Sequence, residues 1–82
     1  MDISKTFAQA IVELNRTAQQ FKSSIVIITK NGTVDAKSIL GLSNSILMSN
    51  SFQLEIHGPD QEIAKKEMGA VFRKYGLSVK IL

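Results

Sequence analysis

Residues 34–48, V-D-A-K-S-I-L-G-L-S-N-S-I-L-M, join the end of a strand to the start of a helix and carry an apolar patch. Ser38 stands directly before the apolar run Ile39-Leu40-Gly41-Leu42. Serine is a favoured N-cap, because its oxygen accepts a hydrogen bond from an N–H group that the helix leaves unpaired. The pattern therefore predicts a short helix from Ser38 to about Leu47. Gly41 would let another surface come close to the backbone of this helix.

A long helix is predicted before this stretch, over residues 2–22, because apolar residues recur there at helical spacing. The apolar stripe is formed by Ile3, Phe7, Ala10, Ile11, Leu14, Ala18 and Phe21. Because the stripe begins at Ile3, there is no room for a strand ahead of the helix.

Two short strands fill the interval between these helices. Residues 25–29 are rich in β-branched side chains, and Asn31-Gly32 is a strong hairpin signal because both residue types accept positive φ. Residues 33–35 return as the partner strand.

The first of these strands is apolar on both faces, so either Ile25 and Ile27 or Val26 and Ile28 must face away from the helices. An exposed apolar sheet face is typical of a partner surface. One reading of the chain is therefore a structural or oligomerising module, such as a homodimer, that uses the face around Ile25 and Ile27. The alternative is that side chains and the termini partly cover this face.

The C-terminal half predicts a strand, a helix and a final strand. Residues 52–57 alternate between apolar and polar, and Gly58-Pro59-Asp60 forms a turn into a helix that ends before Gly76. Residues 77–82 alternate again, and a strand–helix–strand crossover would place them parallel to residues 52–57. We expect Val79 and Ile81 to be buried at that sheet edge. The helix is expected to bury Ala64, Met68, Val71, Phe72 and Tyr75.

Lys37-Ser38-Ile39-Leu40-Gly41-Leu42 resembles the regulatory-serine segment of the histidine-containing phosphocarrier protein (HPr) family. The resemblance includes Asn31-Gly32 and Gly58-Pro59-Asp60 and covers most of the chain. It implies one α+β domain over residues 1–82, an HPr-like open-faced sandwich of order α-β-β-α-β-α-β. Its helices would lie on one face of a mainly antiparallel sheet, with the C-terminal strand at the edge that the family's N-terminal strand normally occupies.

The family's active histidine, which is followed by Ala-Arg-Pro, has no counterpart here, because Phe7-Ala8-Gln9-Ala10 stands at that spacing. The departure removes the family's phosphorelay chemistry and makes the chain similar to the family's catabolite-repression paralogue. In the family, a kinase phosphorylates the regulatory serine, and the modified protein binds a transcriptional regulator. The resemblance therefore implies regulatory phosphorylation at Ser38 and these two classes of protein partner.

The amino-acid composition and the absence of known motifs exclude several classes of function. The chain has no cysteine, and its seven carboxylates are scattered without metal-ligand spacing, a Gly-rich phosphate loop or a nucleophile elbow, so we predict no enzyme, cofactor or metal site. No apolar run is long enough for a membrane span and no signal pattern is present, which favours the cytoplasm. A net charge of +3 does not by itself favour nucleic-acid binding.

His57 is the only histidine, and the alternation of its strand places it outward. A residual phosphocarrier that uses His57 is therefore an alternative, but an exposed strand histidine is the simpler reading. Ser38 is the strongest candidate site, either as a plain N-cap or as a regulatory serine. The partner-binding residues predicted around it are Lys37, Ile39, Leu40, Ser43 and Leu47.

Overall fold

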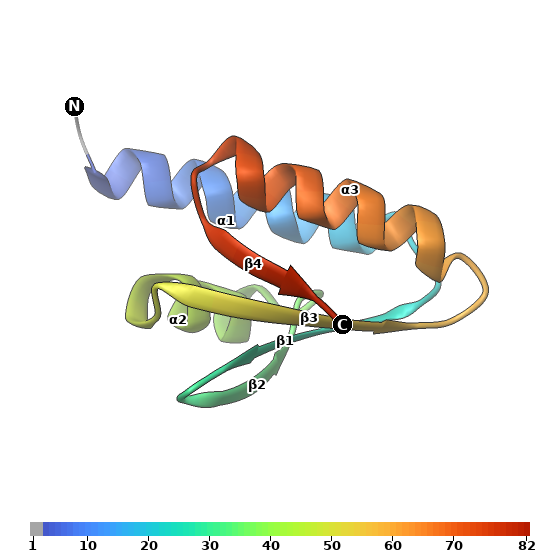
Figure 1. Cartoon of the computed structure of the whole chain (residues 1–82). Helices are drawn as coiled ribbons and strands as arrows, with labels where there is room; N and C mark the ends of the chain where they lie inside the picture. The colour runs from blue at the N-terminus through green and yellow to red at the C-terminus, as the bar shows by residue number, and fades with distance from the viewer. Residues whose placement is uncertain (1–2) are drawn as a thin grey trace.

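The computed structural model describes residues 3–82 as three helices and a four-stranded sheet (Figure 1). The helices are α1 (Ile3–Gln19), α2 (Ile39–Met48) and α3 (Gln61–Lys74). The strands are β1 (Ser24–Thr29), β2 (Gly32–Asp35), β3 (Ser51–His57) and β4 (Ser78–Ile81). The predicted order of elements is confirmed, although α1 ends three residues before Lys22. Asp2 and the side chain of Ile3, which the prediction included, lie outside what the structure describes.

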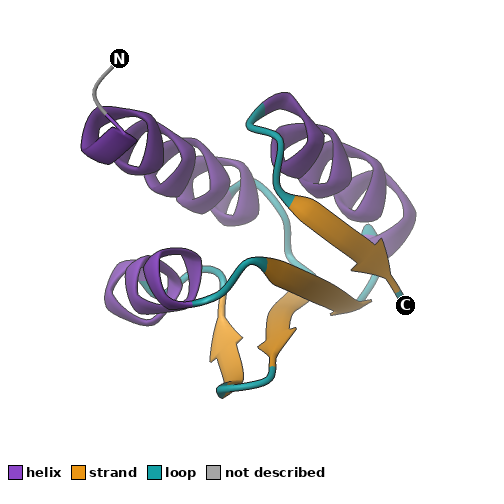
Figure 2. Cartoon of the chain, turned by 60° about the vertical axis from the view of Figure 1, so that its left-hand side comes forward, coloured by secondary structure: helices purple, strands orange, loops and turns teal. Residues whose placement is uncertain are grey.

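The sheet has the strand order β2-β1-β3-β4. β1 is antiparallel to both β2 and β3, whereas β4 is parallel to β3, with Val79 opposite Phe52 and Ile81 opposite Leu54. α1, α2 and α3 all lie on one side of the sheet (Figure 2). The mainly antiparallel sandwich with a parallel C-terminal edge strand is thus the predicted fold.

The core lies between the three helices and the inner face of the sheet. Ile25 and Ile27 point into it, with exposed fractions of 1% and 0%, so the predicted outward surface around these two residues is wrong. Val26 and Ile28 face outward instead, and each is half-buried between polar cross-strand neighbours. Those neighbours are Asp35 and Glu55 for Val26, and Thr33 and Gln53 for Ile28. The outer face is therefore mostly polar and does not offer an apolar docking surface.

The hairpin between β1 and β2 differs in detail from the prediction. Thr29 pairs with Gly32, so the two-residue loop is Lys30-Asn31, and only Gly32 has a positive φ. The Asn31 side chain instead donates hydrogen bonds to the carbonyl of Met48 at 3.3 Å and to Ser49 Oγ at 3.2 Å. The hairpin thereby satisfies a carbonyl at the C-terminal end of α2.

α3 ends abruptly at Gly76, and the chain turns there toward β4. Gly76 has φ +70°, which favours glycine, and its N–H donates to Arg73 while the N–H of Leu77 donates to Phe72. The predicted helix end at Gly76 is confirmed. Val79 and Ile81 pair with β3 as predicted, but they are half-buried rather than buried, because β4 lies at the sheet edge.

Asp60 ties the start of α3 to the end of the α1–β1 loop. Its carboxylate accepts hydrogen bonds from the backbone N–H groups of Lys22 at 2.9 Å and Ser23 at 3.0 Å, and from the Ser23 hydroxyl. These bonds, led by the one from the hydroxyl, hold the pKa of the Asp60 carboxyl below its ordinary value. The side chain therefore links two loops and does not cap its own helix.

Ser45 is an exception in the core, because its buried hydroxyl has no hydrogen-bond partner among the described residues. An unpaired hydroxyl loses its hydration without compensation, and alanine is the better helix former. We expect Ser45→Ala to raise the free energy of unfolding by about 1 kcal/mol. Urea unfolding measures the change, and a loss of stability would show that the hydroxyl has a partner in solution.

Candidate functional site

α2 exposes an unusual number of apolar side chains for a short helix. Leu42 and Ile46 are buried on its inner side. Its outer side carries Leu40, which is 82% exposed, together with Met48, Leu47 and Ile39 at 65%, 58% and 45%. The helix contains no charged residue. We call Ser38, Ile39, Leu40, Leu47 and Met48 the α2 surface.

Ser38 occupies the N-cap position of α2, with φ −93° and ψ 110°, and its carbonyl accepts a bond from the N–H of Leu42 at 2.9 Å. Its side chain makes no capping hydrogen bond, so the predicted role of the hydroxyl as a cap is wrong. The hydroxyl is instead on an exposed residue beside the first N–H groups of the helix. Such unpaired N–H groups, with the positive end of the helix dipole, form a favourable environment for a phosphate.

Lys37 forms hydrogen bonds within the protein. Its ammonium donates to the carbonyl of Phe21 at 2.7 Å, and its carbonyl accepts a bond from the Gln19 side chain at 2.8 Å. Asn15 similarly donates to the carbonyl of Ala36 at 3.2 Å. The segment before Ser38 is thus held against the end of α1, and the contact of Lys37 with a partner stays a prediction.

Ser43 and Gly41 also make their contacts within the protein. The Ser43 hydroxyl donates to the carbonyl of Ile39 at 2.6 Å, so it is engaged within α2. A Cβ at Gly41 would lie 3.4 Å from Val34 Cβ, so this glycine faces β2 and not an external surface. Ile39, Leu40 and Leu47 are exposed as predicted. Met48 was missed, because the predicted helix ended at about Leu47, whereas α2 extends to Met48.

Phe7, whose position the sequence resemblance equates with that of the active histidine, lies on α1. Its half-buried ring lines a cavity of about 330 Å³ beside the C-terminal end of α2, together with Lys30, Leu47 and Met48. This position therefore offers no imidazole. His57 lies on the outer face of the sheet, with its Nε2 3.7 Å from Glu55 Oε2 and its side chain 74% exposed. Phe7 on α1 and His57 on the outer face of β3 thus lie on opposite sides of the sheet.

Within residues 3–82, no group of three or more histidine, cysteine or acidic side chains is arranged to hold a metal ion. None of the helices in that range is long and apolar enough to cross a membrane.

A comparison with protein-family models matches residues 6–74 to the PTS HPr component phosphorylation site. The chain belongs to the HPr family. The matched region includes both Ser38 and Phe7. A comparison with functionally curated proteins finds no match.

Solved structures agree with this assignment. An HPr dimer from Thermoanaerobacter tengcongensis is 32% identical over 83% of this chain and 80% of its own, with a TM-score of 0.74. HPr-C-His from the same organism is 29% identical over 76% and 71%, with a TM-score of 0.65. Bacillus subtilis Crh, a catabolite-repression protein that forms a swapped dimer, is 24% identical over 82% and 78%, with a TM-score of 0.70, and shares the fold.

Proposed function

We propose that this HPr-family protein is a non-catalytic regulator that binds another protein through the α2 surface and is controlled by phosphorylation at Ser38. The observation that carries the proposal is the exposed serine at the N-terminus of a helix whose outer side is apolar. Apolar side chains that remain exposed together on one element commonly mark an interaction surface. Phe7 in place of the active histidine supports the absence of phosphorelay.

Phosphorylation of Ser38 would add roughly 1.5–2 negative charges at the positive end of α2 without requiring the helix to unfold. Lys37, the adjacent cation, already donates to Phe21, so it is not positioned to neutralise this charge. A partner that recognises the phosphate should therefore supply its own arginine or lysine beside an apolar contact for Leu40. A serine kinase and a transcriptional regulator, both located in the cytoplasm, are the partners that we propose.

The docking surface is tested by Leu40→Asp, with Ile63→Asp as the matched control. Both residues are exposed and lie in the first turn of a helix, where an acidic side chain suits the helix dipole. We expect Leu40→Asp to weaken binding of the phosphorylated protein to the family's transcriptional regulator by about tenfold or more, as for a central contact. Surface plasmon resonance measures the affinity. Equal affinities of the two variants would place the interface elsewhere.

A further inference from the structure

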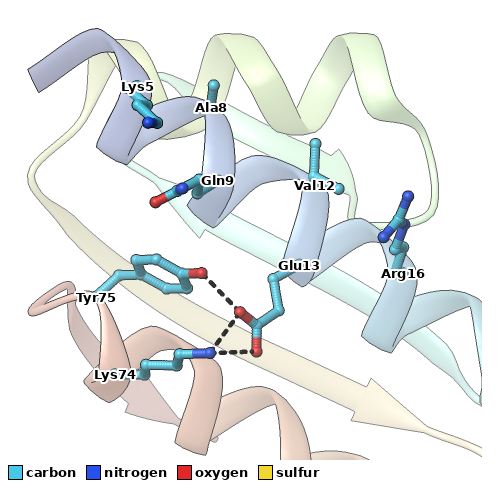
Figure 3. A pocket seen from close by; sticks show the side chains of 8 residues that line it. All are labelled: Lys5, Ala8, Gln9, Val12, Glu13, Arg16, Lys74 and Tyr75. Atoms are coloured by element: carbon cyan, nitrogen blue, oxygen red, sulfur yellow. Dashed lines mark hydrogen bonds and ion pairs between the residues drawn. The ribbon is translucent and has the colours of Figure 1, made fainter. Parts of the chain in front are cut away.

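A groove of about 770 Å³ lies between α1 and the C-terminal end of α3, away from the α2 surface (Figure 3). α1 contributes side chains spaced at i, i+4, i+8 and i+11, which places them along one side of the helix. The polar lining consists of Lys5, Gln9, Glu13 and Arg16 from α1, Lys74 from α3, and Tyr75, which directly follows α3. A volume in this range is typical of small-ligand sites.

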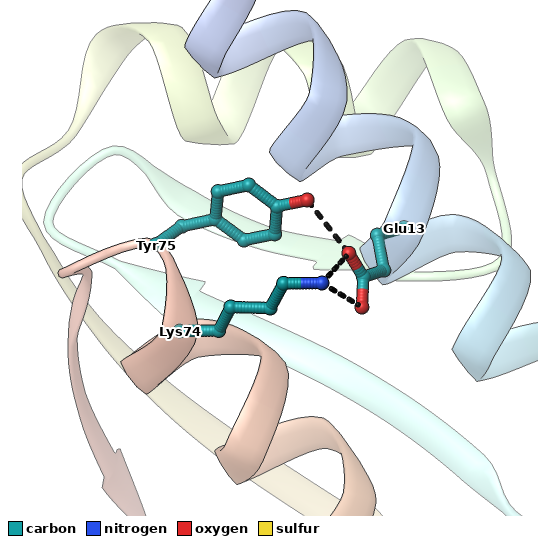
Figure 4. A network of polar contacts seen from close by, with 3 residues as sticks. All are labelled: Glu13, Lys74 and Tyr75. Atoms are coloured by element: carbon teal, nitrogen blue, oxygen red, sulfur yellow. Dashed lines mark hydrogen bonds and ion pairs between the residues drawn. The ribbon is translucent and has the colours of Figure 1, made fainter.

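One of the side chains that line the groove, Glu13, is a carboxylate that already has two donors (Figure 4). The Lys74 ammonium lies 2.8 and 3.1 Å from the two oxygens of Glu13, and the Tyr75 hydroxyl donates to one of them at 2.6 Å. The bonds from Lys74 and then Tyr75 lower the pKa of the Glu13 carboxyl, and the same contacts raise the pKa values of Lys74 and Tyr75. Two donors at the C-terminal end of α3 therefore converge on one anionic group.

The charges around this carboxylate are unbalanced. Two cations that line the groove, Arg16 and Lys74, stand beside the single acid of its lining, Glu13. Arg16 is exposed and forms no ion pair with another described residue, although it lies less than one helical turn from Glu13. Gln9, about one turn before Glu13, adds an amide that can donate a hydrogen bond. The lining thus has more donors and more positive charge than its own carboxylate uses.

We propose that this groove binds a small polyanion, a phosphate or a polycarboxylate, whose anionic group replaces Glu13 as the acceptor for Lys74 and Tyr75. Arg16 and Gln9 line the same groove and would supply further donors to a ligand that extends beyond this position. Glu13 is then an internal competitor that keeps the affinity low until a ligand with more than one negative charge displaces it. The site is independent of the α2 surface and does not require phosphorylation of Ser38.

The test is a titration of the full chain, followed by amide NMR chemical shifts, with inorganic phosphate and citrate as probes and sodium chloride at matched ionic strength as the reference. Glu13→Gln removes the competing charge and leaves Lys74 and Tyr75 in place. We expect it to tighten binding of at least one probe by about fivefold, the order of an exposed ion pair. Lys74→Gln in the Glu13→Gln background should abolish the saturable shifts, and Tyr75→Phe should weaken them.

Lys66→Gln is the matched control, because it removes the same charge from an exposed position on α3 outside the groove. Each variant is first checked for an intact fold by its amide spectrum. The proposal is overturned if Glu13→Gln binds both probes no better than the wild type, or if Lys66→Gln weakens binding as much as Lys74→Gln. It is also overturned if only an acidic peptide gives saturable shifts, since the groove would then be a protein-docking surface. Response to phosphate alone or to citrate alone identifies which polyanion the groove accepts.

Discussion

Replacing Gly58 by alanine should lower the free energy of unfolding by about 3 kcal/mol or more, since overpacking and a disallowed backbone angle each cost roughly 1–3 kcal/mol. Gly58 has φ +151°, and a Cβ there would lie 2.5 Å from both the Cα and the Oγ of Ser23. Ser23 is buried and bound to Asp60, so it cannot move away without breaking the link between the two loops. Urea unfolding followed by circular dichroism measures the loss.

Gly32→Ala is the control for this prediction, because it separates backbone strain from the close contact. Gly32 has φ +125°, but a Cβ there would meet no atom within 4 Å. We expect strain alone, about 1–3 kcal/mol, and thus a smaller loss than for Gly58→Ala. Equal losses for the two variants would mean that the approach of Ser23 to Gly58 is not close in solution.

Ending the chain at Gly76 should remove about 2–4 kcal/mol of stability, since a fully buried large apolar side chain contributes roughly 1.5–3 kcal/mol and three, Leu77, Val79 and Ile81, are half-buried here. The truncation deletes Val79 and Ile81 and exposes the edge of β3, including Phe52 and Leu54. For a small domain this loss approaches its whole stability. Thermal unfolding should show a greatly lowered midpoint or no cooperative transition.

Lys80→Ala provides the comparison within the same strand, because Lys80 is exposed and faces away from the core. A surface substitution of this kind should change stability by no more than about 0.5 kcal/mol. If the truncated chain were as stable as the Lys80→Ala variant, β4 would not be part of the folded domain.

Much of the fold could be predicted because its signals are local and periodic. The apolar spacing in α1 fits only a helix with one buried side, and the strict alternation in β3 fits only a strand with one buried face. Gly76 adopts the positive φ that ends α3. The faces of β1 could not be assigned, because Ile25 to Ile28 are all apolar and only the packing of the helices decides which side is buried. The half-burial of β4 likewise depends on its place at the edge.

The candidate site was only partly predictable, because side-chain partners far apart in sequence are not visible in a pattern. Ser38 and the exposed Leu40 followed from the sequence, but the bond from Lys37 to Phe21 spans 16 residues. The contact between Glu13 and Lys74 spans 61 residues. The i, i+4 spacing on α1 indicates that its groove-lining residues share one side of the helix. No pattern in the sequence indicates that Lys74 and Tyr75 lie opposite them.

Phosphorylation by the family's bifunctional serine kinase with ATP tests the central claim most directly. Intact-mass analysis of the wild type, Ser38→Ala and His57→Ala should show one phosphoryl group on the wild type and on His57→Ala, stable to acid, and none on Ser38→Ala. Ser38→Ala is a suitable control, because the hydroxyl makes no capping bond and its loss should change stability by no more than about 0.5 kcal/mol. An unmodified wild type, or a phosphoryl group that is lost in acid and absent from His57→Ala, would contradict the account.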